Sequence, residues 1–186
     1  LKGTHQIQNS GIAIAASHYM NKIFPIKNSA IDTGLKTVRW SARLQKINKG
    51  PLAEILPYQV ELWLDGGHNH DASLAIAKTI HNWKQQDPSL TFHLIFGSLN
   101  NRETETLLAP FVEIIDLIQT VAIPKHESTA SPENVANVAL SLGFDAAPSN
   151  SLFSAIEAII SKSNGKRIIL VYGSLYLAGS ILEKNY

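Results

Sequence analysis

The sequence contains no cysteine among its 186 residues, which excludes disulfide bonds and thiolate metal sites. This absence is compatible with a reducing cytoplasm, and we expect the protein there. No run of apolar residues is long enough to cross a membrane, and the N-terminus lacks the pattern of a signal peptide. Neither sign of charge dominates, because sixteen Lys and Arg stand against fifteen Asp and Glu without blocks of like charge. We therefore expect neither a membrane nor a nucleic acid as a partner.

The composition that remains is that of a globular protein, since 45% of the residues are hydrophobic and can form a sizeable core. The first residue is leucine rather than methionine. We take this as a sign that parts of a longer chain are missing. A change in pattern near Trp40 predicts a domain boundary, with residues 1–40 separate from residues 41–186.

Hydrophobic periodicity and turn signals predict alternating helices and strands. We expect helices over residues 5–20, 69–86, 102–110, 151–162 and from about 175, with another opened by Ser131-Pro132 and closed by Gly143. Ser29 and Asp32 fit a capping box for a short helix that Gly34 ends or loosens. Strands are expected at 43–47, 60–64, 91–97, 167–172 and within 114–123. Such alternation predicts an α/β fold, a mostly parallel Rossmann-like sheet with helices on both faces, preceded by a helical segment.

The most informative local pattern is the pentapeptide Asp65-Gly66-Gly67-His68-Asn69, which follows an apolar strand and opens a helix. In open α/β sheets, ligands bind beyond the carboxyl ends of the strands, where glycines admit phosphates and helix N-termini favour anions. Similar strand ends occur at residues 94–98 and 168–174. We therefore expect Asp65 and His68 to face a substrate at a shared sheet edge.

Each of these residues also has a structural interpretation. His68 could equally cap its helix or hydrogen-bond within its own turn, and Arg43 could form a surface ion pair. A metal at His68 and His70 is disfavoured because their spacing fits no recognised zinc pattern, and we assign no metal ligands. A buried Asp65 needs a partner such as an arginine or a ribose hydroxyl, and Arg43 is the candidate nearby.

Four ordered motifs resemble a known family. Residues 1–9 resemble the segment that ends the central ATPase domain of Mur-type ligases. Residues 39–45, 64–69 and 172–179 resemble, in order, signatures of folylpolyglutamate synthase, an enzyme often bifunctional with dihydrofolate synthase. The resemblance makes residues 1–40 the C-terminal tail of the ATPase domain and residues 41–186 the C-terminal, glutamate ligase domain.

What the resemblance implies is an ATP-dependent, ADP-forming ligase that joins L-glutamate to a folate or dihydropteroate through an acyl phosphate. Asn9, Arg43 and Asp65 would contact ATP, His68 would lie at the reacting centre, and Ser174 would hold the incoming glutamate. The ligands of Mg²⁺ and the phosphate-binding loop would belong to a missing N-terminal ATPase domain. The fragment alone is therefore expected to be inactive.

This sequence departs from the family pattern at three places. Ser41-Ala42 replaces the expected Pro-Gly before Arg43, His70 replaces a proline, and residues 100–103 replace an acidic run. Two other interpretations stay open at this point: a muramyl-peptide amino acid ligase, and a nucleotide-binding module without catalytic activity. Gly66 and Asn69 favour the folate branch over the muramyl one.

Overall fold

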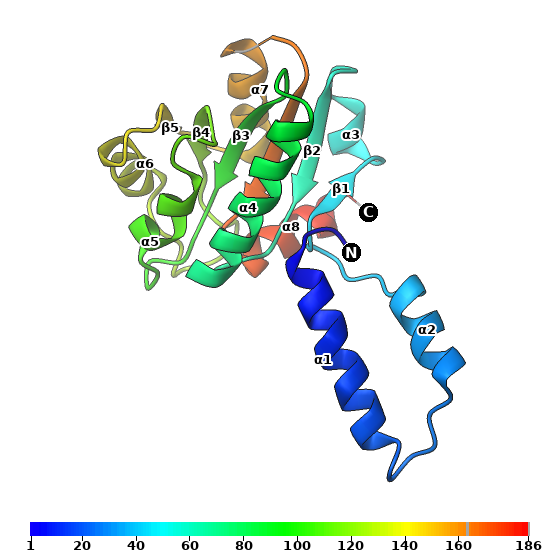
Figure 1. Ribbon diagram of the computed structural model, residues 1–186. Helices are drawn as coiled ribbons and strands as arrows, with labels where there is room; N and C mark the ends of the chain where they lie inside the picture. The colour runs from blue at the N-terminus through cyan, green and yellow to red at the C-terminus, as the bar shows by residue number, and fades with distance from the viewer. Residues whose placement is uncertain (163, 186) are drawn as a thin grey trace. The chain divides into compact units, whose positions relative to one another are not determined.

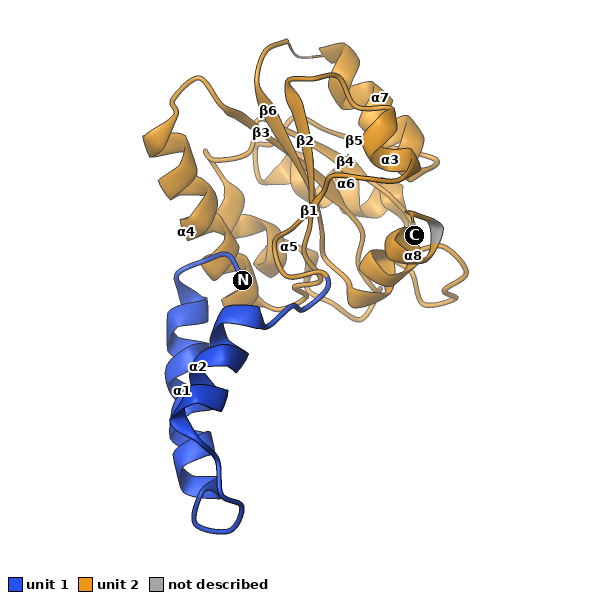
Figure 2. Cartoon of the chain, turned by 90° about the vertical axis from the view of Figure 1, so that its right-hand side faces the viewer, with its two compact units in different colours: residues 1–41 blue, residues 42–186 orange. Residues whose placement is uncertain are grey.

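The computed structural model describes residues 1–162 and 164–185. Its elements follow the chain in this order: α1 (His5–Met20), α2 (Asn28–Thr37), β1 (Gln45–Ile47), α3 (Pro51–Glu54), β2 (Val60–Leu64), α4 (His70–Gln86), β3 (Thr91–Phe96), α5 (Thr104–Leu108), the 3₁₀ turn η1 (Ala109–Phe111), β4 (Leu117–Thr120), α6 (Pro132–Ser141), β5 (Ala146–Pro148), α7 (Leu152–Lys162), β6 (Arg167–Tyr172) and α8 (Leu175–Asn185). The chain divides into two compact units, residues 1–41 and 42–186, which Figure 2 shows in different colours.

The first unit contains α1 and α2. The predicted helix over residues 5–20 is confirmed, but the capping box is wrong. α2 begins at Asn28 with Lys27 at its N-cap and no side-chain cap, so Ser29 lies inside the first turn. Asp32 instead pairs with Lys36 at 2.8 Å, one turn along the same exposed helix face. Gly34 does not end the helix, which continues to Thr37.

The second unit is built on one sheet, which over the described residues has six strands in the order β1-β2-β6-β3-β4-β5. β1 is antiparallel to β2, and the other neighbouring pairs are parallel. The predicted mostly parallel sheet is confirmed. β6 is buried along its whole length, as expected for a central parallel strand rich in Ile, Leu and Val.

Helices cover both faces of this sheet, as predicted (Figure 1). On one face α4, α5 and α6 contribute to a hydrophobic cluster with the buried strand side chains of that face. Their residues in it include Ile76, Ile80, Leu108 and Val135. On the opposite face α3, α7 and α8 contribute a second cluster that includes Leu52, Ile156 and Ile181. The helices therefore cover the two faces of the sheet. The ends of the strands are left to carry polar groups, and we call the end where the parallel strands finish the carboxyl edge.

Two helix starts follow the expected capping chemistry. Asn69 is the N-cap of α4, and its Oδ1 accepts the Ala72 N–H at 2.9 Å. Ser131 caps α6, where Pro132 occupies the first turn, and Gly143 follows that helix with a φ of 92°. The prediction of this helix and its boundaries is confirmed.

His93 lies inside the sheet, on β3, with 2% of its surface exposed. Burial lowers its pKa to about 4, the Arg167 guanidinium acts in the same direction, and the Asp116 carboxylate opposes them. In the unfolded chain the pKa of His93 is 6.5. Between pH 6.5 and pH 4 the unfolded state therefore binds a proton at His93 while the folded state does not, and the folded state loses stability as the pH falls.

We expect that lowering the pH from 7 to 4 reduces the free energy of unfolding by about 3 kcal/mol through His93 alone. Urea titrations at pH 7 and pH 4 measure the effect. The variant His93→Gln, which cannot titrate, should lose correspondingly less stability between the two pH values. An equal loss in both proteins would show that His93 does not set the acid sensitivity.

Candidate functional site at the carboxyl edge of the sheet

The turn after β2 follows directly from the pairing of β2 with β6. The Asp65 N–H donates to the carbonyl of Val171 at 3.0 Å, which extends the parallel pairing by one residue. A Cβ at Gly67 would lie 2.6 Å from the Tyr172 ring and 2.7 Å from its hydroxyl oxygen. Only glycine therefore lets the chain turn this closely over Tyr172.

The carboxylate of Asp65 organises this edge. Its Oδ2 accepts the Leu44 N–H at 2.8 Å and its Oδ1 accepts the Gly67 N–H at 2.7 Å, while only 4% of the residue is exposed. Backbone donors to a carboxylate are among the stronger hydrogen bonds in proteins. The bond from the Leu44 N–H to Asp65 and the bond from the Gly66 N–H to the Ala42 carbonyl, at 3.0 Å, join the segment before β1 to the turn after β2.

Arg43 lies between these two connections. Because β1 is antiparallel to β2, with Gln45 opposite Leu64, the residues before β1 reach the edge where β2 ends. Ala42 and Leu44 have left-handed backbones, with φ of 54° and 41°. The Arg43 Nη1 donates to the Ala42 carbonyl at 3.1 Å and lies 3.4 Å from where a Gly66 Cβ would be. The guanidinium is thus held over the glycine turn.

The alternative of a surface ion pair for Arg43 is wrong for this structure. The ion pairs of the described residues involve lysines, and Arg43 is not a member of any of them. The Arg43 side chain is half-buried. A half-buried cation of this kind favours an anionic ligand.

The ends of β6 and β3 adjoin the same turn. The Gly97 N–H donates to the Tyr172 carbonyl at 3.1 Å, and a Cβ at Gly173, whose φ is 113°, would lie 2.7 Å from the Gly97 carbonyl oxygen. A Cβ at Gly66 would meet the Leu175 side chain at 2.5 Å. The three strand ends singled out in the sequence therefore meet at one edge of the sheet.

Ser174 begins α8 at this edge and is 4% exposed. Its Oγ accepts the Tyr176 N–H at 3.1 Å and its carbonyl accepts the Ala178 N–H at 3.1 Å. The Ser174 Oγ and carbonyl thus both accept N–H groups of the first turn of α8. At the neighbouring strand end, the Ser98 hydroxyl is buried without a hydrogen-bond partner among the described residues.

His68 bonds within its own turn, which is the structural alternative considered for it. Its Nδ1 lies 3.2 Å from the Gly66 carbonyl, and because a carbonyl only accepts, Nδ1 carries the proton. In the neutral ring, Nε2 then has a free lone pair. His70 turns away, with its Nδ1 3.1 Å from the Thr106 carbonyl. The two imidazoles are thus committed to different partners.

The electrostatics of the edge favour an anion. α4 and α8 both begin here, and each helix N-terminus carries a partial positive charge. Arg43 adds a full charge. The Tyr172 hydroxyl, 3.0 Å from the Ser73 Oγ, is buried, which raises its pKa above the ordinary value and keeps it protonated. The edge thus has the charge pattern of a phosphate or carboxylate site.

The structure brings together four of the five residues that the sequence singled out: Arg43, Asp65, His68 and Ser174. Asn9 belongs to the other unit, where its amide donates to the Gln6 side chain at 3.1 Å. Sequence reasoning missed the backbone of Leu44 and the ring of Tyr172. The signal for Tyr172 was its place directly before Gly173-Ser174 at the end of a buried strand.

Two further properties of the described residues bear on function. These residues contain no cluster of three or more His, Asp or Glu side chains that could hold a metal ion. Nor is any of their helices long and apolar enough to cross a membrane.

Comparison with known proteins identifies the family. Residues 48–184 match the family described as "Dihydrofolate synthetase, C-terminal domain". The chain belongs to this family. A dihydrofolate synthase/folylpolyglutamate synthase of Bacillus subtilis is 29% identical over 99% of the chain. Only 40% of that protein is covered, so this member of the dihydrofolate synthetase family spans about two fifths of its relative's length.

Solved structures show the same fold. The folylpolyglutamate synthase of Mycobacterium tuberculosis, complexed with ADP and AMPPCP, has a TM-score of 0.78 at 18% identity, over 98% of this chain and 40% of that one. The bifunctional folylpolyglutamate synthase/dihydrofolate synthase of Yersinia pestis, complexed with AMPPNP and a Mn ion, has a TM-score of 0.70 at 19% identity, over 92% of this chain and 37% of that one. These likenesses confirm the Rossmann-like fold of the family.

Proposed function

We propose that this chain is the C-terminal part of an ATP-dependent ligase that adds L-glutamate to a folate or dihydropteroate and forms ADP. The observation that carries the proposal is the meeting of Arg43, Asp65, His68 and Ser174 at one sheet edge, beside the N-termini of α4 and α8. A cationic edge of this kind suits the phosphates of ATP and the carboxylate of glutamate.

The proposed reaction has two steps. A carboxylate oxygen of the folate substrate attacks the γ-phosphorus of ATP, and ADP leaves. The amino nitrogen of glutamate then attacks the acyl carbon of the acyl phosphate, inorganic phosphate leaves and an amide forms. Both steps depend mainly on positioning and on neutralising phosphate charge.

The residues at the edge have separate roles in this proposal. The Arg43 guanidinium neutralises phosphate charge, and Asp65 holds Arg43 in place through the Leu44 N–H. The free Nε2 of His68 takes up the proton that the glutamate amine loses when the amide forms. The Ser174 Oγ accepts the Tyr176 N–H, and its hydroxyl hydrogen donates to a carboxylate oxygen of glutamate.

We do not place a metal at this edge. Mg²⁺ binds through oxygen ligands, usually carboxylates together with substrate phosphates, and no cluster of this kind is found in the part of the chain that the structure describes. We propose that the Mg²⁺ of the reaction is held by a separate ATPase domain of the same longer protein.

The first unit supports that arrangement. Its two helices have no buried residue, and large apolar side chains are exposed on α1, including Ile7 at 74%, Ile12 at 69% and Tyr19 at 67%. Such surface is typical of a segment that is covered in a larger assembly. We propose that residues 1–40 complete the ATPase domain, with Asn9 hydrogen-bonding the adenine.

The test of the proposal is the replacement of Arg43 by alanine in the longer protein. Loss of its charge should raise the apparent KM for ATP at least tenfold, since a charged hydrogen bond is worth about 1.5–3 kcal/mol. ADP formation with dihydropteroate or folate and glutamate measures it. Lys162→Ala removes an exposed cation that pairs with Asp145 near the opposite edge, and should leave the KM unchanged.

The alternative of a non-catalytic module is tested by the same assay on the unaltered protein. Glutamate-dependent ADP formation supports the ligase, and its absence with every folate substrate rejects it. These 186 residues on their own should form no ADP, because the proposal assigns the phosphate-binding loop and the metal ligands to the missing domain.

A further inference from the structure

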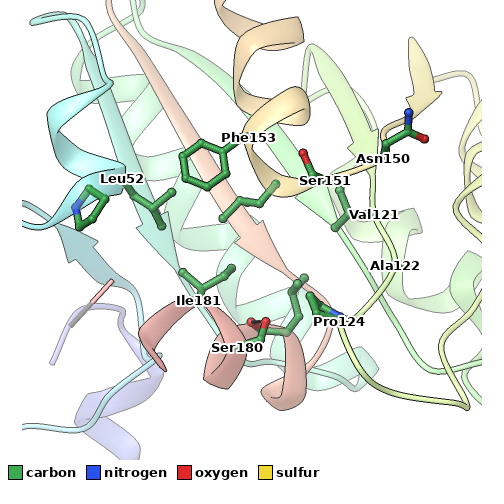
Figure 3. A pocket seen from close by; sticks show the side chains of 12 residues that line it. Leu52, Val121, Ala122, Pro124, Asn150, Ser151, Phe153, Ser180 and Ile181 are labelled. Atoms are coloured by element: carbon green, nitrogen blue, oxygen red, sulfur yellow. Dashed lines mark hydrogen bonds between the residues drawn. The ribbon is translucent and has the colours of Figure 1, made fainter. Parts of the chain in front are cut away.

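A pocket lies within residues 42–186, on the face of the sheet that α3, α7 and α8 cover. Its volume is about 390 Å³. An apolar cavity of about 150 Å³ already holds benzene, and ligand pockets begin at about 300 Å³. Figure 3 shows side chains from all three helices and from the segment after β4 around the same space: Leu52, Val121, Phe153 and Ile181. Leu177 also lines it.

The chemistry of the walls limits the ligand. None of the side chains that line the pocket is charged. ATP, a folate and glutamate all carry charge, and the pocket does not suit their charged groups. Phe153 leaves 47% of its surface exposed at this site, which offers an aromatic face to an incoming molecule.

The polar groups of the pocket are few and mostly occupied. The Ser180 Oγ donates to the Leu177 carbonyl at 2.8 Å, and the Ser151 Oγ accepts the Ser154 N–H at 3.1 Å. The Asn150 side chain is exposed, makes no hydrogen bond to another described residue, and points away from the interior in Figure 3. The pocket therefore offers an apolar interior with few polar groups.

The walls are fixed without a ligand. The Asn185 side chain accepts the Leu52 N–H at 3.0 Å and donates to the Lys49 carbonyl at 2.9 Å, which ties the α3 wall to the end of α8. Across the pocket, the Ile123 N–H donates to the Thr129 Oγ1 at 2.8 Å and holds the segment after β4. A pre-formed pocket costs its ligand little ordering of the protein.

We propose that this pocket binds a small uncharged aromatic molecule of the indole class. The pocket size admits a bicyclic ring, the uncharged walls select against anions, and the partly exposed Phe153 ring offers an aromatic surface to the ligand. This site is separate from the proposed ligase reaction and does not depend on it.

Indole is the probe that tests the proposal. Calorimetry and saturation-transfer NMR on the 186-residue chain should show one saturable site with a Kd at or below about 1 mM. Ser180→Leu and Ala122→Trp fill the interior and the rim, respectively, and each should weaken binding at least tenfold. Ser161→Leu is the matched control, because Ser161 is exposed on α7 and makes the same hydroxyl bond to the carbonyl three residues earlier.

Circular dichroism and urea midpoints establish that each variant is folded. Two results would overturn the proposal: no saturable binding of indole, or equal binding by the unaltered chain and by both folded pocket variants. Indole that binds Ser161→Leu as weakly as Ser180→Leu would likewise assign the effect to something other than the pocket.

Discussion

Asparagine in place of Asp65 is expected to lower the free energy of unfolding by about 2–3 kcal/mol and to raise the apparent KM for ATP at least tenfold. Both carboxylate oxygens accept backbone N–H groups, from Leu44 and Gly67. An amide has only one oxygen, so its NH₂ group must face one of these donors and leave it unsatisfied. The segment that presents Arg43 then loses its attachment to the turn.

Urea unfolding of the chain measures the first effect, and ATP titration of the longer protein measures the second. Asp145→Asn is the control, because that carboxylate is exposed and pairs only with Lys162 in the described contacts. If Asp65→Asn changes neither stability nor the ATP dependence, the two backbone bonds do not position Arg43, and the proposed role of Asp65 is wrong.

Alanine in place of Gly67 is expected to cost about 3 kcal/mol, the upper end of the usual penalty for an added methyl group in a packed interior. The new Cβ would lie 2.6 Å from the Tyr172 ring, which has no exposed surface and packs against Phe96 and Phe111. Neither the ring nor the turn can move far. The midpoint of urea unfolding reports the loss.

Gly179→Ala is the matched control for Gly67. Gly179 is exposed within α8, and a Cβ there meets nothing within 4 Å, so alanine should gain about 0.5–1 kcal/mol through helix propensity. The penalty at Gly67 should also shrink in a Tyr172→Ala background. An undiminished penalty in that background would contradict a steric cause.

Much of the fold could be predicted because buried parallel strands and amphipathic helices carry distinct patterns. The strand Arg167–Tyr172 and the helix begun by Ser131-Pro132 are clear examples. The strand Ala146–Pro148 was not predicted. It has only three residues, ends in proline and is the outermost strand of the sheet, where the hydrophobic pattern is weakest. The antiparallel direction of β1 was equally hidden, since a three-residue strand has no signal for direction.

The site could be predicted only in part. The glycine turn after β2 was visible in the sequence, and so was its likeness to the ends of β3 and β6. The sequence could not show that the Asp65 carboxylate accepts two backbone N–H groups, because one of them belongs to Leu44, twenty-one residues earlier. Nor could it show that His68 is tied to the Gly66 carbonyl, which sets the tautomer.

The central claim is that the edge formed by Arg43, Asp65, His68 and Ser174 meets the nucleotide and the glutamate. A crystal structure of the longer protein with an ATP analogue and glutamate tests it most directly. We expect the Arg43 guanidinium within hydrogen-bonding distance of a phosphate oxygen, and the Ser174 hydroxyl on a glutamate carboxylate. A nucleotide held wholly by the other domain, with this edge open to solvent, would contradict the account.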